Sequence, residues 1–414
     1  MTPPSVPRAL APVLAALAMI GPFTIDTLFP AFPAIGAQFG ADTLAMQQSI
    51  SVYLLAYAVM SIVHGPLSDA LGRRRVILGG LLVFAAASAG CAMATSLPML
   101  LAFRALQGLS AGVGIIVGRA VIRDVLAGDA AQRLMSHVSM IFGVAPAIAP
   151  LIGAWLLGHG RWPLIFWFLV AFALAVLVAV WMLLPETHPP TRRQPLRVPS
   201  LLRGYARMLG NGRFVRLALA GGLNFAALFL YIASAPALVL EHLQLGPDGF
   251  GWFFIPMISG MMLGAFVSGR MAGRVATVLQ VRIGFACCIA AAAINMVYHT
   301  LVVPPAVLPT VLPILLNAFG IALVFPILTL VILDLYPEAR GAASSLQMFV
   351  GLLLNTLMAG VVSPWLSHDL KWLSLAAGVL SLLAWLIWRL EHMQRPRGPG
   401  GYYEAVGLEP IDEL

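Results

Sequence analysis

Two ionisable residues stand inside long apolar stretches, where they could carry proton chemistry. Asp26 lies in the first stretch and Arg104 in the fourth. A charge inside a membrane span costs about 2.5–3.5 kcal/mol, so such a residue usually faces a cavity or a partner. At 1.5 Å per residue, Asp26 lies about 25 Å from one membrane face and Arg104 about 10 Å from the other, at similar depths. An arginine keeps its charge whereas an aspartate can gain or lose a proton, so the pair predicts proton coupling.

Each residue also has a purely structural interpretation. The first helix could end early, because Pro30 and Pro33 follow closely, and Asp26 would then cap it among the lipid headgroups. Arg104 could form a permanent ion pair that joins two helices.

The connection between the second and third apolar stretches concentrates charge and glycine. We expect a tight loop in which Gly65 and Gly72 turn the chain, because glycine tolerates positive φ. Asp69 lies four residues before Arg73, and Asp124 ends the fourth stretch. We expect these three charged residues to form a latch that locks one conformation and breaks in the other.

Composition indicates an integral membrane protein. The chain has 414 residues, of which 60% are hydrophobic and 10% charged, and its mean hydropathy is +0.94. Soluble domains carry about 25% charged residues. The net charge of +8 comes from basic residues that punctuate apolar runs, which argues against nucleic acid as a partner. Cys91, Cys287 and Cys288 lie in apolar runs and predict packing residues, so we expect no metal site and no cofactor.

A membrane span needs about 20 apolar residues. On that criterion the chain is all-α, with twelve transmembrane helices in two pseudo-symmetric six-helix bundles. The expected spans are 9–33, 45–66, 75–95, 98–121, 134–157, 163–184, 214–240, 250–271, 280–302, 307–332, 341–365 and 371–390. The expected division is a first bundle (1–188), a linker (189–212), a second bundle (213–392) and a tail (393–414).

The basic residues predict the orientation. Of the 24 Lys and Arg, Arg104 lies within a span, Arg161 and Lys371 lie on one side, and the other 21 lie on the side of Arg73. Because basic residues in short loops stay in the cytoplasm, we expect both termini there.

The fifth span and a set of polar residues are further candidates. Pro146 and Pro150 should bend the fifth span, and Gly143 and Gly153 should permit close packing. Sparse hydrogen-bonding groups among many Met and Phe side chains suit varied drug-like ligands. The candidate ligand-binding residues are Tyr53, Tyr57, Asn224, Tyr231, Asn317, Gln347 and Asn355. For each of them alone, packing is the alternative role.

Several motifs resemble those of the major facilitator superfamily. Residues 65–77 meet the pattern G-x-L-[SD]-D-x-x-G-R-[RK]-x-x-[IL] of its loop 2–3 signature. Residues 100–108 resemble its fourth-helix motif L-x-x-x-R-x-x-Q-G, which implies the coupling role for Arg104 and a ligand-side role for Gln107. Residues 143–153 resemble the fifth-helix motif of its exporters, although the usual Gly-Pro pair is Ala145-Pro146. Alternatively, Pro146 and Pro150 only shape a helix in an importer.

Further segments narrow the resemblance to the bicyclomycin/chloramphenicol-resistance type (Bcr/CflA) of drug:proton antiporter. They are 25–33, 119–124, 142–153, 184–187, 231–236 and 341–346. The resemblance implies multidrug efflux, with small hydrophobic or amphipathic compounds exported from the bacterial inner membrane in exchange for protons. It also implies alternating access, energy from the proton gradient and action as a monomer.

Two other functions compete with this interpretation. One is an exporter of a specific metabolite such as an amino acid or nucleoside. The other is a membrane-embedded enzyme or receptor, which would need a nucleophile–base pair or a metal constellation. The eight histidines are scattered, with no H-x-x-x-H pattern and no Cys/His cluster, so we do not expect an enzyme.

Overall fold

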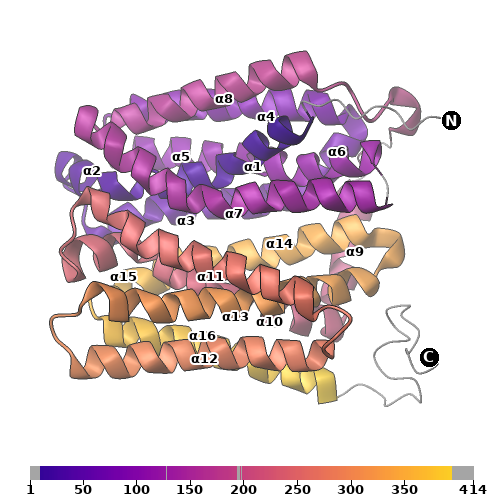
Figure 1. Ribbon diagram of the computed structural model, residues 1–414. Helices are drawn as coiled ribbons and strands as arrows, with labels where there is room; N and C mark the ends of the chain where they lie inside the picture. Colours follow the sequence, from indigo (N-terminus) through magenta and orange to yellow (C-terminus); the bar gives the residue numbers. More distant parts are fainter. Residues whose placement is uncertain (1–9, 127, 194–195, 197, 394–414) are drawn as a thin grey trace.

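The computed structural model describes residues 10–126, 128–193, 196 and 198–393, and in this part of the chain the regular structure is helical. Figure 1 shows long helices running roughly side by side, the first half of the chain above the second. The start of α1 (Leu10–Asp26) and the end of α16 (Leu370–Met393) lie at one end of the molecule, here named the terminal end. The opposite end, where α2 and α15 lie, is named the distal end. The predicted tail lies, apart from Met393, outside the described residues.

The first half supplies six spans. Its helices are α1 (Leu10–Asp26), η1 (Phe29–Ala31), α2 (Phe32–Phe39), α3 (Thr43–Leu71), α4 (Arg73–Ala92), α5 (Leu97–Gly112), η2 (Val113–Val117), α6 (Gly118–Val125), α7 (Gly128–His159) and α8 (Pro163–Leu183). Short helices continue long ones, so that α1 to α2 and α5 to α6 each make one span.

The second half repeats this number of spans. A linker with η3 (Pro190–Arg192) and α9 (Val198–Leu209) precedes it. Its helices are α10 (Gly212–Ala233), η4 (Ala237–His242), η5 (Pro247–Gly249), α11 (Phe250–Met271), α12 (Thr277–Leu301), α13 (Val307–Asp334), η6 (Pro337–Ala339), α14 (Arg340–Leu357), η7 (Met358–Val362), α15 (Ser363–Leu366) and α16 (Leu370–Met393).

The twelve-span prediction is confirmed. Eleven helices of the described part are long and apolar enough to cross a membrane. The twelfth is α7, which has 32 residues and an apolar section at Gly143–His159.

The first span differs from the single helix expected over 9–33. Its α1 ends at Asp26, the chain is irregular at Thr27 and Leu28, and helix resumes until Phe39. Proline explains the break, because Pro30 has no N–H to donate and its ring clashes with the carbonyl four residues earlier, that of Asp26.

The prediction of a turn at Gly65 is wrong. Helix α3 continues through Gly65 and Pro66 to Leu71, and Gly72 alone makes the turn, with a φ of 100°. Pro66 leaves the carbonyl of Ile62 without its helical donor. The hydroxyl of Tyr205 on α9 donates to that carbonyl at 2.9 Å, which satisfies it.

The linker is more ordered than the polar connection predicted for 189–212. Tyr205 and Met208 of α9 are buried in the core of the second half, while Tyr205 bonds to α3 of the first half. Burial raises the pKa of Tyr205 to about 12, so its hydroxyl keeps its proton and remains a donor at neutral pH. Helix α9 therefore bridges the two halves.

The two halves close against each other at the distal end. Gln47 Nε2 donates to Ser363 Oγ at 2.9 Å, and Gln48 Nε2 donates to the carbonyl of Gly360 at 2.9 Å. Phe29 of the first half stacks on Phe250 of the second, with ring centroids 6.3 Å apart. These contacts shut the distal side of the interface between the halves.

Candidate functional site

Asp26 lies inside the protein, midway along the first span. Its side chain is 4% exposed, and it is the last of the 17 residues of α1 in a span that continues to Phe39. No hydrogen bond or ion pair joins its carboxyl group to another residue of the described chain. The position at the helix break therefore presents an unpaired acid within the bundle and not a cap among headgroups.

Arg104 is fully buried and is held by oxygen atoms of three helices. Its Nε donates to the carbonyl of Ser49 at 3.0 Å, and its Nη1 donates to the carbonyl of Thr24 at 3.0 Å. The ring of Tyr53 lies 4.7 Å from the guanidinium carbon. Thr24 is two residues before Asp26, so the acid and the base lie at matching depths, but this conformation has no ion pair between them.

Gln107 lies beside Arg104 and not in an open cavity. Its Oε1 accepts from Arg104 Nη1 at 2.9 Å, and its Nε2 donates to Ser88 Oγ at 2.8 Å. Cys91 Sγ lies 3.6 Å from the same Oε1. Gln107 is fully buried, so the amide orients the guanidinium instead of meeting a ligand in this conformation. Sequence reasoning missed Ser88, whose one signal is a polar residue in an apolar span.

The structure brings the three residues of the predicted latch together at the terminal end. Arg73 Nη1 lies 2.5 Å from Asp69 Oδ1, and Arg73 Nε lies 3.0 Å from Asp124 Oδ2. Arg73 also donates to Ser68 Oγ at 2.6 Å. The cluster thus joins α3, α4 and α6 of the first half.

Two further residues complete this cluster, both from the segment after α8. Thr187 Oγ1 donates to Asp124 Oδ2 at 3.1 Å, and Glu186 Oε1 accepts from the backbone N–H of Arg73 at 2.9 Å. Glu186 thereby caps the start of α4, where a carboxylate is favoured by the helix dipole. Sequence reasoning did not place them here, since 113 residues separate Arg73 from Glu186.

We expect Gly72→Ala to destabilise this corner. The φ of 100° disfavours any side chain, and a Cβ would overlap the carboxylate of Glu186. The expected cost is about 1–3 kcal/mol, measurable as a lower thermal unfolding midpoint in detergent. Gly65→Ala is the matched control, because Gly65 is helical and the nearest atom to its Cβ would be Ser345 Oγ at 3.9 Å. Equal midpoints for the two variants would contradict this account.

The fifth-helix residues lie in α7 and differ in their packing. A Cβ on Gly153 would overlap the carbonyl of Thr27, so this glycine lets α7 touch the break in the first span. No atom of the described residues lies within 4 Å of a Cβ on Gly143, so they show no close packing there. Pro150 is buried and Pro146 is partly buried, both inside the helix.

The predicted ligand-binding residues are all buried in this conformation. Gln347 donates to Thr329 Oγ1 at 2.9 Å, and the backbone carbonyl of Asn317 lies 3.5 Å from Cys288 Sγ inside the second half. Polar atoms without a hydrogen-bond partner in the described residues include the hydroxyl of Tyr57, the amide of Asn317 and Oδ1 of Asn355. The exposed fractions are Tyr53 0%, Tyr57 5%, Gln107 0%, Asn224 1%, Tyr231 2%, Asn317 1%, Gln347 8% and Asn355 7%.

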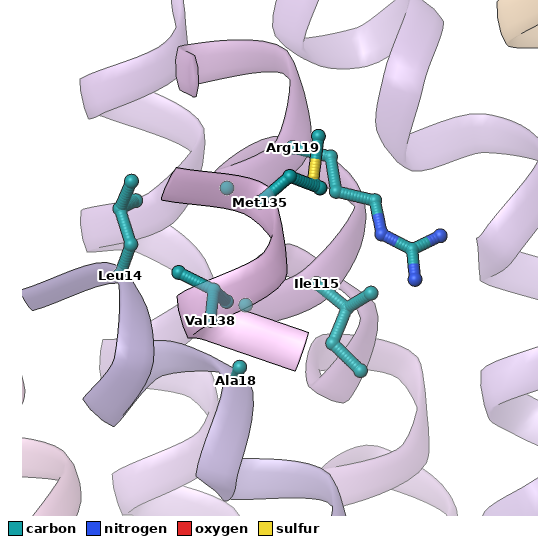
Figure 2. Close-up of a pocket in the computed structure, with 8 residues that line it drawn as sticks. Leu14, Ala18, Ile115, Arg119, Met135 and Val138 are labelled. Atoms are coloured by element: carbon teal, nitrogen blue, oxygen red, sulfur yellow. The ribbon is translucent and has the colours of Figure 1, made fainter. Parts of the chain in front are cut away.

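A small pocket lies towards the terminal end of the first half, and none of the predicted ligand-binding residues lines it (Figure 2). Its volume is about 30 Å³, which is room for about two water molecules. Its lining residues come from α1, η2, α6 and α7: Leu14, Ala18, Gly114, Ile115, Gly118, Arg119, Met135 and Val138.

Twelve spans in two halves, with an unpaired acid and a buried arginine in the interior, define a membrane transporter of the secondary class. The chain belongs to the Major Facilitator Superfamily, whose family model matches residues 14–359. The protein is thus a transporter and not an enzyme, as predicted.

Named relatives agree with this assignment. The chain is 29% identical over 403 residues to multidrug resistance protein D of Escherichia coli, covering 93% of this chain and 97% of the relative. It is 26% identical over 273 residues to a bicyclomycin resistance protein homolog of Haemophilus influenzae, covering 66% and 69%. Other relatives are named chloramphenicol resistance proteins. The predicted resemblance to the resistance-transporter type is confirmed.

The fold also matches solved structures. A D-xylose-proton symporter has a TM-score of 0.72 at 14% sequence identity, with 92% of this chain and 97% of that chain covered. At this identity the match shows the fold alone.

Proposed function

We propose that the protein exports small hydrophobic or amphipathic compounds, including drugs, in exchange for protons. The observation that carries the proposal is the unpaired, buried carboxyl group of Asp26 at a helix break. A carboxylate in such surroundings is costly unless water, a cation or a positive substrate group reaches it. Loading and release of a proton at Asp26 would therefore accompany the opening of the interior to one side or the other.

Arg104 supports this role by position. It is bonded to the backbone two residues before Asp26 and so keeps a fixed positive charge at the depth of the acid. The resistance functions named for the relatives support drug-like substrates. Of the described Lys and Arg outside Arg104, Arg161 and Lys371 alone lie at the distal end, so we propose that both termini face the cytoplasm of a bacterium. We propose a monomer that uses the proton gradient and no cofactor.

Transport in a host that lacks its own efflux pumps tests the substrate class. The protein should raise resistance to several chemically unlike apolar drugs, and its effect should disappear when an uncoupler collapses the proton gradient. Excretion of amino acids and nucleosides should stay at the level of the empty-vector control. A change confined to one excreted metabolite would favour the specific exporter instead.

The Asp69–Arg73–Asp124 cluster is proposed to act on conformation without touching the substrate. Asp69→Asn removes one of the two carboxylates of Arg73, and we expect several-fold slower turnover with drug affinity preserved. Because Asp69 is nearly half exposed, its loss should change stability by less than about 1 kcal/mol. Transport rate and drug Kd on the same preparation give the readout.

The matched control is Asp334→Asn, which removes the acid of the exposed Asp334–Arg340 pair at the same end of the second half. It should leave turnover unchanged. Loss of drug binding in Asp69→Asn, with the rate of conformational exchange intact, would count against a latch.

A further inference from the structure

Among the described residues, Arg119 is the one charged residue that lines the small pocket of the first half. Its side chain is exposed, although the residues beside it are apolar. Leu14 and Ala18 of α1 are almost fully buried, and Met135 and Val138 of α7 are partly buried. Figure 2 shows the guanidinium reaching out past Met135 and Ile115, on the side away from Leu14. The pocket thus has an apolar end and a cationic end.

The guanidinium of Arg119 has no carboxylate partner in the described residues. Both acids of the neighbouring Asp69–Arg73–Asp124 cluster are bonded to other groups. Asp124, one turn further along the same helix, accepts from Arg73 at 3.0 Å and from Thr187 at 3.1 Å. Asp69 is paired with Arg73. Among the described residues of the first half, no carboxylate therefore pairs with Arg119.

A second arginine strengthens the positive field near Arg119. Arg123 lies four residues after Arg119, on the same side of α6, and is also exposed and without an ion pair in the described chain. Two like charges at this spacing repel each other. An anionic group placed at Arg119 would relieve that repulsion and gain charge-assisted hydrogen bonds.

We propose that this pocket binds the anionic group of an exported amphiphile, with the carboxylate, sulfonate or phosphate on Arg119 and the first carbon atoms of the apolar portion against Leu14 and Val138. This inference rests on the proposed export function and names one substrate class for it. A volume of about 30 Å³ holds a small group and not a whole drug, so the pocket is a subsite. It lies apart from Asp26, since Ala18 is eight residues before that acid and about 12 Å from it along the helix axis.

A matched pair of ligands separates charge from shape. The probes are a fluorescent aryl carboxylate and its methyl ester, titrated against the full chain in nanodiscs of phosphatidylcholine. In Arg119→Gln we expect the Kd of the carboxylate to rise about tenfold or more and that of the ester to change less than about twofold. Arg119→Lys should recover part of the carboxylate affinity, because it restores the charge but not the paired donors.

Arg123→Gln is the control for a general loss of positive field. It should weaken carboxylate binding by less than about threefold, since Arg123 does not line the pocket. Equal weakening of acid and ester in Arg119→Gln, or no weakening of either, would overturn the proposal. Binding of the ester reports that each variant is folded.

Proteoliposome export distinguishes a substrate from a lipid headgroup. With an imposed pH gradient, Arg119→Gln should lose carboxylate export while it retains ester export. The alternative outcome is that Arg119→Gln changes only the ability of phosphatidylglycerol to displace the probe, while export of both compounds is unchanged. The occupant is then a lipid, and the substrate assignment is wrong. Absence of ester export in the unmutated protein would reject the proposed function itself, so the two failures remain distinct.

Discussion

We expect Asp26→Asn to abolish export driven by an imposed pH gradient, while binding of neutral drugs is retained. The substitution keeps the size of the side chain and removes its ability to release a proton. Since Asp26 is 4% exposed and has no partner in the described residues, no other acid shares its position at the helix break. Proteoliposomes loaded with a pH-sensitive dye would report drug-induced proton flux, which should fall to the level of empty vesicles.

The variant should remain folded. An amide does not carry the cost of a buried charge, so the thermal midpoint of Asp26→Asn should equal or exceed that of the parent. Asp42→Asn is the matched control, because Asp42 is an exposed N-cap of α3 that accepts from the N–H of Ala45 at 2.8 Å. Because asparagine caps a helix about as well as aspartate, it should change stability little and leave proton flux intact. Undiminished proton-driven export by Asp26→Asn would remove this residue from the coupling mechanism.

Arg104→Met should destabilise the first half by about 3 kcal/mol or more and stop transport. The guanidinium satisfies the carbonyls of Ser49 and Thr24 and the side chain of Gln107, and its removal leaves three buried acceptors without this donor. Each unsatisfied buried group costs about 1–3 kcal/mol. The midpoint of thermal unfolding in detergent gives the stability, and drug efflux from vesicles gives the activity.

Two further variants sharpen this test. Arg104→Lys keeps the charge but lacks the planar set of donors, so it should recover only part of the stability. Arg161→Met removes an exposed arginine between α7 and α8, whose Nη2 donates to Gln38 Oε1 at 3.3 Å, and should behave as the parent. A midpoint for Arg104→Met equal to that of Arg161→Met would show that the buried bonds contribute little.

The spans could be read from the sequence because each needs a run of about 20 apolar residues, which is a local property. Contacts between residues far apart in the sequence were harder to infer. Asp69 and Arg73 are one helical turn apart by sequence spacing, whereas Glu186 reaches Arg73 only through the packing of α8 beside α4. The bond from Tyr205 to Ile62 was equally hidden, although Pro66 inside an apolar run indicates a carbonyl in need of a donor.

Ligand-binding residues were the least predictable part. A tyrosine or asparagine in an apolar span identifies a polar group but not the face of the helix that it occupies. Asn317 and Tyr231 lie in the interior of the second half, and Gln107 serves Arg104. Arg119 was not predicted as a binding residue, because its segment, 119–124, indicated only a family resemblance. Its place beside an apolar pocket depends on how α1, α6 and α7 meet.

The contact of Gly153 with Thr27 gives Asp26 a mechanical connection to the far half of the molecule. Helix α7 rests on the backbone just after the acid, and the same helix packs along α11, where a Cβ on Gly251 would lie 3.4 Å from Leu151. A shift of the broken segment on protonation would push directly on α7 and so tilt one bundle against the other. Titration of a single side chain could thereby be converted into rocking of the whole transporter through two helices.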